Sequence, residues 1–191
     1  MCGIVGLFLK DKSLEPKLGA MLSEMLVSLS DRGPDSAGIA IYGAPSSNEA
    51  KITIQSAKPA RDFRDLDTEL AKAIGAPVSI AVKSTHAVVR TAPAKIDEAR
   101  EAIQALRPDI RIMGAGDVVE IYKEVGLPEA VVDRFDVRKM SGTHGIGHTR
   151  MATESAVTTM GAHPFSTGAD QCLVHNGSLS LIHISEPTRP Y

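Results

Sequence analysis

The residue best suited to covalent chemistry in this sequence is Cys2, which becomes the first residue of the chain once the initiator methionine is removed. A terminal α-amino group has a pKa near ~8, so a fraction of it is unprotonated near neutral pH and can accept the thiol proton. The resulting thiolate is the nucleophilic form of cysteine. A lone cysteine is more often a small buried side chain than a nucleophile. A catalytic role for Cys2 therefore needs support from the rest of the sequence.

Two further groups complement such a nucleophile. Asn176 and Gly177 follow an apolar segment at 171–174, where an Asn-Gly pair is most often a hairpin turn. The asparagine amide and the glycine N–H are also two donors of the kind that form an oxyanion hole. Arg150 ends another predicted strand; it is either a surface charge or a guanidinium that binds a substrate carboxylate through two hydrogen bonds.

Hydrophobic patterning predicts the elements that must position these residues. The apolar start of the chain predicts a buried strand, and a helix follows, with Pro16 just inside its start and apolar residues as far as Leu29. Further strands are expected at 38–42, from 143 and from 171. Between them the pattern predicts strands at 51–56 and 110–113, one long strand or a pair at 78–89, and helices at 61–74, 96–106, 118–125 and 128–135. This alternation predicts a small α/β subdomain inserted between two catalytic segments.

Composition limits the class of protein. The 191 residues, 43% hydrophobic and 23% charged, suit one globular domain, alone or with an inserted subdomain. The net charge of −2 argues against nucleic acid or a membrane surface as the main partner. Two cysteines imply no disulfide framework, and neither a leader nor a long apolar stretch is visible. We therefore expect a cytoplasmic protein.

Metal and cofactor chemistry is not expected. The histidine spacings match no familiar zinc pattern, and no phosphate-binding glycine loop is present. Five of the six histidines follow residue 140, and we expect them to be structural or to line a substrate site: His144, His148, His163, His175 and His183. A papain-like site built on Cys172 is an alternative, but a thiol in the middle of an apolar strand is expected to be inert.

Five separated motifs resemble, in the same order, those of class II glutamine amidotransferases. They lie at residues 2–6, 32–38, 147–153, 162–164 and 175–177. The resemblance implies an α+β fold of the N-terminal-nucleophile hydrolase type, a four-layer αββα sandwich of antiparallel sheets. It also implies hydrolysis of L-glutamine to glutamate and ammonia through a thioester on the terminal cysteine.

The same resemblance implies a role for each matching residue. Cys2 would be the nucleophile and, through its amine, the base, while Asn176 and Gly177 would form the oxyanion hole. The substrate would be bound by Arg150, on the glutamine α-carboxylate, with Thr153 and His163, and the site would be supported by Arg32 and Asp35. Met151 stands where several branches have tryptophan, which argues against the sugar-phosphate-synthesising branch.

The long insertion bears on the domain organisation and the partner. Residues 1–43 and 140–180 are expected to form the amidotransferase domain, and residues 44–139 the inserted subdomain. Such an insertion resembles the stand-alone amidotransferase subunits of glutamate-synthase-like and N-methylglutamate synthase systems. In those systems ammonia passes to a separate synthase chain, which is therefore the expected partner.

The end of the sequence departs from the family pattern. Residues 181–191 resemble translated adapter sequence rather than any part of the family, so we expect a non-native tail and a domain that is incomplete at its C-terminus. The aspartate that orients the glutamine amino group in the family has no counterpart here. Two alternatives therefore stay open: another N-terminal-nucleophile amidohydrolase, or a truncated non-catalytic fragment or interaction subunit.

Overall fold

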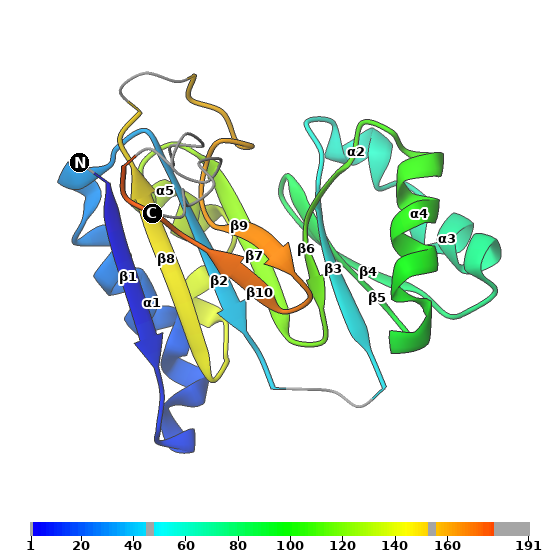
Figure 1. Ribbon diagram of the computed structural model, residues 1–191, viewed down its shortest axis with the longest axis horizontal. Helices are drawn as coiled ribbons and strands as arrows, with labels where there is room; N and C mark the ends of the chain where they lie inside the picture. The colour runs from blue at the N-terminus through cyan, green and yellow to red at the C-terminus, as the bar shows by residue number, and fades with distance from the viewer. Residues whose placement is uncertain (1, 45–47, 153–155, 178–191) are drawn as a thin grey trace, which may run out of the picture.

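Two antiparallel sheets stacked between helices make up the structure, a computed structural model that describes residues 2–44, 48–152 and 156–177. Figure 1 shows helices on the outer side of each sheet and a short hairpin in front of the first sheet. The order of layers is therefore helices, sheet, sheet, helices. The predictions for Thr153 and for the tail at 181–191 lie outside the described residues.

The first sheet carries most of the residues of the predicted site. Its strands, in spatial order, are β1 (Gly3–Phe8), β8 (His144–Arg150), β2 (Ser36–Tyr42) and β7 (Val119–Val125), and each neighbouring pair is antiparallel. Helices α1 (Leu18–Val27) and α5 (Pro128–Arg134) cover one face. Because side chains alternate along a strand, the apolar residues on that face form one core. This first core includes Leu22, Leu26, Ile39, Tyr122 and Phe135.

The second sheet is built from the middle of the chain. Its strands are β4 (Ser79–Lys83), β5 (His86–Thr91), β3 (Ala50–Gln55) and β6 (Arg111–Gly116), in that order and all antiparallel. Helices α3 (Leu66–Ile74) and α4 (Ile96–Leu106) pack on its outer face through Ile52, Ile54 and Val89. This is the split βαβ arrangement, in which each helix crosses over to a strand that is not the next neighbour.

The remaining elements are short. Helix α2 (Pro59–Asp62) precedes α3, and the hairpin of β9 (Phe165–Gly168) and β10 (Gln171–Leu173) forms a small third sheet. The 3₁₀ helices span Lys12–Lys17, Ser30–Arg32, Pro93–Lys95 and Val137–Lys139. The part of the chain that the structure describes has no helix long and apolar enough to cross a membrane.

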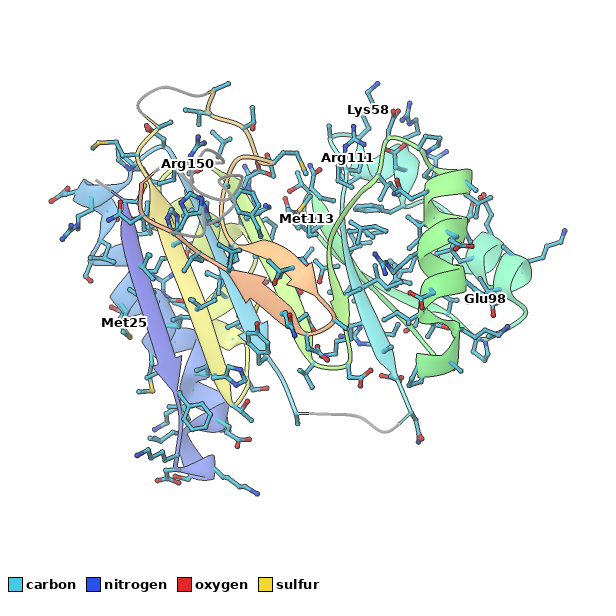
Figure 2. The ribbon with its side chains drawn as sticks, viewed as in Figure 1. Met25, Lys58, Glu98, Arg111, Met113 and Arg150 are labelled. Atoms are coloured by element: carbon cyan, nitrogen blue, oxygen red, sulfur yellow. The ribbon has the colours of Figure 1, made fainter. Side chains whose placement is uncertain are left out.

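A third group of apolar side chains joins the layers. Met113 of β6 packs against Val119 and Ile121 of β7, with Cys172 of β10 at the same cluster, and Figure 2 shows Met113 between the two sheets. The carboxylate of Asp170, at the turn between β9 and β10, accepts backbone N–H groups of residues 117–119, each at 2.9 Å. The hairpin is thereby attached to the β6–β7 turn.

The structure confirms an α+β fold with antiparallel sheets and corrects several elements. Residues 118–125 were expected to be helical, but β7 is a strand that pairs along its whole length with β2. Pro16 lies inside a 3₁₀ helix, so α1 begins only at Leu18. The stretch at 78–89 is a pair of strands, with Ser84 at φ 55° in the turn.

The division into domains stays a prediction, but the packing bears on its boundaries. The split βαβ unit spans residues 50–116. β7 and α5 fall within the expected insertion at 44–139, yet β7 is a strand of the first sheet and α5 packs on that sheet. The sheet of this unit is antiparallel, so the unit is of the α+β type and not of the expected α/β type.

Candidate functional site

Cys2 and Asn176 meet at one end of the first sheet. Cys2 directly precedes β1, whose first residue, Gly3, pairs with Thr149 of β8. The side-chain amide of Asn176 donates a hydrogen bond from Nδ2 to the carbonyl oxygen of Cys2 at 3.3 Å. The sulfur of Cys2 lies 3.9 Å from the carbonyl oxygen of Met151. Residues that are 174 positions apart in the sequence are thus brought into direct contact.

Arg150 lies at the same end of the sheet, where Figure 2 shows it above β8. The loop before β2 runs alongside it: the backbone N–H of Asp35 donates to the carbonyl oxygen of Arg150 at 3.1 Å. The Asp35 carboxylate accepts the N–H of Ala152 at 2.7 Å, so it holds the chain on the far side of Arg150. The Arg150 guanidinium donates from Nη1 to the carbonyl oxygen of Ala156 at 3.3 Å.

A cluster of three histidines lies behind Asn176. The ring of His163 is tilted against that of His148, with 4.2 Å between the ring centres, and meets the ring of His175 edge-on at 4.4 Å. His148 donates from Nε2 to the carbonyl oxygen of His175 at 3.0 Å. His163 is 5% exposed, and neither of its ring nitrogens has a hydrogen-bond partner among the described residues. The cluster supports the segment that carries Asn176.

Burial sets the charge state of this cluster. Desolvation lowers the pKa of His148 to about 4 and the pKa of His163 to about 3, with further lowering from neighbouring histidines. His86, buried against Tyr122 and Phe135, also has its pKa lowered by desolvation to about 4. All three rings are therefore neutral at pH 7.

Acid is expected to destabilise the protein through these histidines. In the unfolded chain they bind protons near pH 6.5, but in the folded protein they do not, so the free energy of unfolding falls as the pH drops below 6.5. From pH 7 to pH 5 the expected loss is about 2 kcal/mol for each histidine. Urea unfolding at the two pH values measures it. A His86→Phe variant, changed outside the site, should show a shallower pH dependence, and a flat profile in the unchanged protein would contradict the expectation.

The loop between β8 and β9 is held by two adjacent residues of β7. Lys123 donates to the carbonyl oxygens of Ala162 at 2.8 Å and Pro164 at 3.1 Å. Glu124 points to the other side of the strand and accepts a short hydrogen bond from the hydroxyl of Thr159. The peptide bond between His163 and Pro164 is cis. Neither of these two charged residues was identified in the sequence as part of the site.

The other predicted residues are placed as follows. Gly177 has φ 109°, in the left-handed region that favours glycine, and it lies in open space. Arg32 is exposed at the end of a 3₁₀ helix, and within the described residues its guanidinium makes no hydrogen bond or ion pair with the other site residues. The structure thus brings Asn176 to Cys2 and Asp35 to Arg150, and it places the 3₁₀ helix that ends at Arg32 against β8 with the Arg32 side chain exposed.

Cys172 is separate from this group. It lies on β10 with its sulfur 3.2 Å from the Tyr42 hydroxyl, and burial raises the pKa of its thiol. With His144 and Phe8 it lines a pocket of about 460 Å³ at the other end of β1 and β8. A raised thiol pKa disfavours the thiolate, which argues against Cys172 as a nucleophile. Among the described residues, no three histidine, cysteine or acidic side chains are grouped so as to hold a metal ion.

Comparison with known proteins points to one class. No protein-family model matches the chain. Over 180 residues, 94% of the chain, it is 71% identical to the glutamine amidotransferase-like protein GlxB of Rhizobium meliloti (strain 1021). It is 34% identical over 195 aligned residues to a putative glutamine amidotransferase of Methanothermobacter thermautotrophicus. The chain spans 60% and 62% of the lengths of these two proteins.

A shorter match extends the comparison. Over 59 residues, 31% of the chain and 10% of the other protein, the chain is 42% identical to a glutamine--fructose-6-phosphate aminotransferase (isomerizing) of Neisseria meningitidis serogroup A. The three relatives support a glutamine amidotransferase domain in this chain.

Proposed function

We propose that this chain is a class II glutamine amidotransferase domain, with an N-terminal-nucleophile fold, that hydrolyses L-glutamine through a thioester on Cys2. The contact between Asn176 and Cys2 is the observation that carries the proposal. It supports an oxyanion hole near the sulfur, because an amide donor already lies at the backbone of Cys2. The relatives named as glutamine amidotransferases support the choice of substrate.

The proposed chemistry proceeds in two steps. The terminal amine takes the Cys2 thiol proton, and the sulfur attacks the side-chain amide carbon of glutamine. The Asn176 amide and the Gly177 N–H stabilise the oxyanion, the carbon–nitrogen bond breaks, and the amine returns the proton to the departing ammonia. Water then hydrolyses the thioester to glutamate and frees the thiol.

Substrate recognition is assigned to the arginine beside the nucleophile. Arg150 binds the glutamine α-carboxylate, since a guanidinium matches a carboxylate with two parallel hydrogen bonds. Asp35 holds the backbone at the carbonyl of Arg150 and at the N–H of Ala152, which supports a positioning role. Thr153 and His163 complete the proposed binding residues, His163 from its buried place under His175. We assign the ammonia to a separate synthase chain and the reaction to the cytoplasm.

Trapping the thioester tests the proposal. Incubation of the purified protein with glutamine and hydroxylamine is expected to yield γ-glutamyl hydroxamate beside glutamate, because hydroxylamine competes with water for a thioester. Asparagine and simple amides serve as competing substrates. Hydroxamate from another amide but not from glutamine would instead support a different N-terminal-nucleophile amidohydrolase. No product from any amide, with a well-folded protein, would support a non-catalytic chain.

A further inference from the structure

Lys123 is an unusual residue for the interior of a sheet. It is 3% exposed, and a buried ammonium is costly unless it is paired or fully hydrogen-bonded. No carboxylate pairs with it in the described part of the chain. Its Nζ instead donates to the carbonyl oxygens of Ala162, Pro164 and, at 3.4 Å, Met160. It also lies 4.5 Å from the centre of the Phe165 ring, in a cation–π position.

The three carbonyls that Lys123 binds belong to one short segment of the loop. They alternate along residues 160–164, so the ammonium fixes the direction of the backbone on both sides of His163. Burial lowers the pKa of Lys123 to about 8, yet the ammonium keeps all its donors satisfied. If the ammonium were removed, the three carbonyl oxygens would lose this shared hydrogen-bond donor. The segment therefore depends on Lys123 for its shape.

The same segment contacts both halves of the candidate site. Gly161 lies against the Arg150 guanidinium: a Cβ built on it would be 3.1 Å from Nη1. His163 packs on the ring of His175, the residue before Asn176. A change in the direction of this segment would thus reach the proposed carboxylate-binding group through Gly161 and the oxyanion donor through His163.

We propose that Lys123 is a positioning residue, which holds the 160–164 segment so that Arg150 and Asn176 keep their places beside Cys2. This assignment rests on the proposed function for its kinetic consequence, whereas the placement of the segment can be measured without it. Lys123 lies on β7 and touches neither Cys2 nor Asn176, so it acts only through the loop.

A matched pair of lysine variants tests the proposal. Lys123→Met removes the donors and keeps the length of the side chain. Lys51→Met is the control, because Lys51 is also largely buried, with a side chain 14% exposed and paired with Glu120 at 2.9 Å, but it lies on β3 away from the loop. Both variants lose stability. Lys123→Met alone is expected to raise the KM for glutamine by about 100-fold and to lower kcat by a smaller factor, because the loop meets the binding groups more directly than the sulfur.

Two additional measurements keep the test decisive. Imidazole NMR signals of His163 and His175 should shift in Lys123→Met and stay in place in Lys51→Met, whether or not the protein hydrolyses glutamine. Lys123→Arg keeps donors for the carbonyls and should keep the KM close to that of the unchanged protein. Lys123→Gln, which has a shorter and uncharged donor, takes the place of Lys123→Met if that variant does not fold, and the same shifts in the histidine signals and in KM are expected of it. Unchanged histidine signals in a folded Lys123→Met, or equal effects of the two methionine variants on KM, would overturn the proposal. Absence of glutamine hydrolysis in the unchanged protein would overturn the proposed function instead.

Discussion

Replacing Cys2 with alanine is expected to lower the rate of glutamine hydrolysis by about 10⁴-fold or more, because no thioester can form without the sulfur. The fold should persist, since Cys2 lies before β1 and, among the described residues, its sulfur forms no hydrogen bond beyond the long one of 3.9 Å to the carbonyl oxygen of Met151. Ammonia release from glutamine measures the loss, and circular dichroism checks the fold. Cys2→Ser keeps a hydroxyl in place of the thiol and should retain a small residual rate.

The second cysteine provides the matched control for this prediction. Cys172→Ala removes a thiol of the same kind from β10, where it contacts the Tyr42 hydroxyl rather than the Asn176 group. Its hydrolysis rate should stay within a few fold of that of the unchanged protein. If Cys172→Ala were inactive and Cys2→Ala active, the papain-like alternative would replace the proposed mechanism.

Replacing Gly38 with alanine is expected to have the largest effect on the fold near the site. A Cβ at Gly38 would lie 2.1 Å from the carbonyl oxygen of His163 and 2.5 Å from the Cβ of Lys123. Both atoms belong to the tightly packed contact between β2, β7 and the loop, so one of these elements must move. Overpacking of this kind costs about 3 kcal/mol of unfolding free energy, measured by urea denaturation.

Gly6→Ala is the control for that substitution. Gly6 lies on β1 of the same sheet, and a Cβ there meets no atom within 4 Å. Both substitutions restrict the unfolded backbone equally. The difference between their effects on the unfolding free energy therefore measures the steric contact at Gly38. Gly38→Ala should also raise the KM for glutamine, since the displaced loop carries His163. Equal stability of the two variants would contradict the close approach of the loop to β2.

The sequence alone was sufficient to predict those elements whose local pattern of apolar residues fits one kind of structure. The strand at the start of the chain and the helix after it follow from apolar spacing that only one kind of element fits. The division of the 78–89 stretch into two strands required the turn at Ser84, whose positive φ no pattern of apolar residues reveals. The contact between Asn176 and Cys2 joins the two ends of the described chain, and only the family resemblance predicted it.

β7 shows why the rest could not be predicted from local pattern. Its apolar residues are spaced so that they fit either a helix or a strand, and pairing with β2 decides between the two. Because residues 118–125 were predicted to be helical, Lys123 was not recognised as a buried residue. In a strand, Val119, Ile121 and Lys123 share one face, so a lysine at the end of an apolar face would have signalled a buried ammonium. A helical interpretation places the same lysine at the surface.

The connection between β2 and β7 has an evolutionary consequence. Tyr42 and Val119 are paired partners at adjoining strand ends, and Lys51 and Gly116 are paired where the split βαβ unit begins and ends. In topological terms the whole unit is an enlarged hairpin loop with its two ends side by side. A lineage could gain, lose or exchange such a module at a single pair of neighbouring positions, with the register of β2 on β8 preserved. The chemistry at Cys2 and the identity of the module can therefore diverge at different rates.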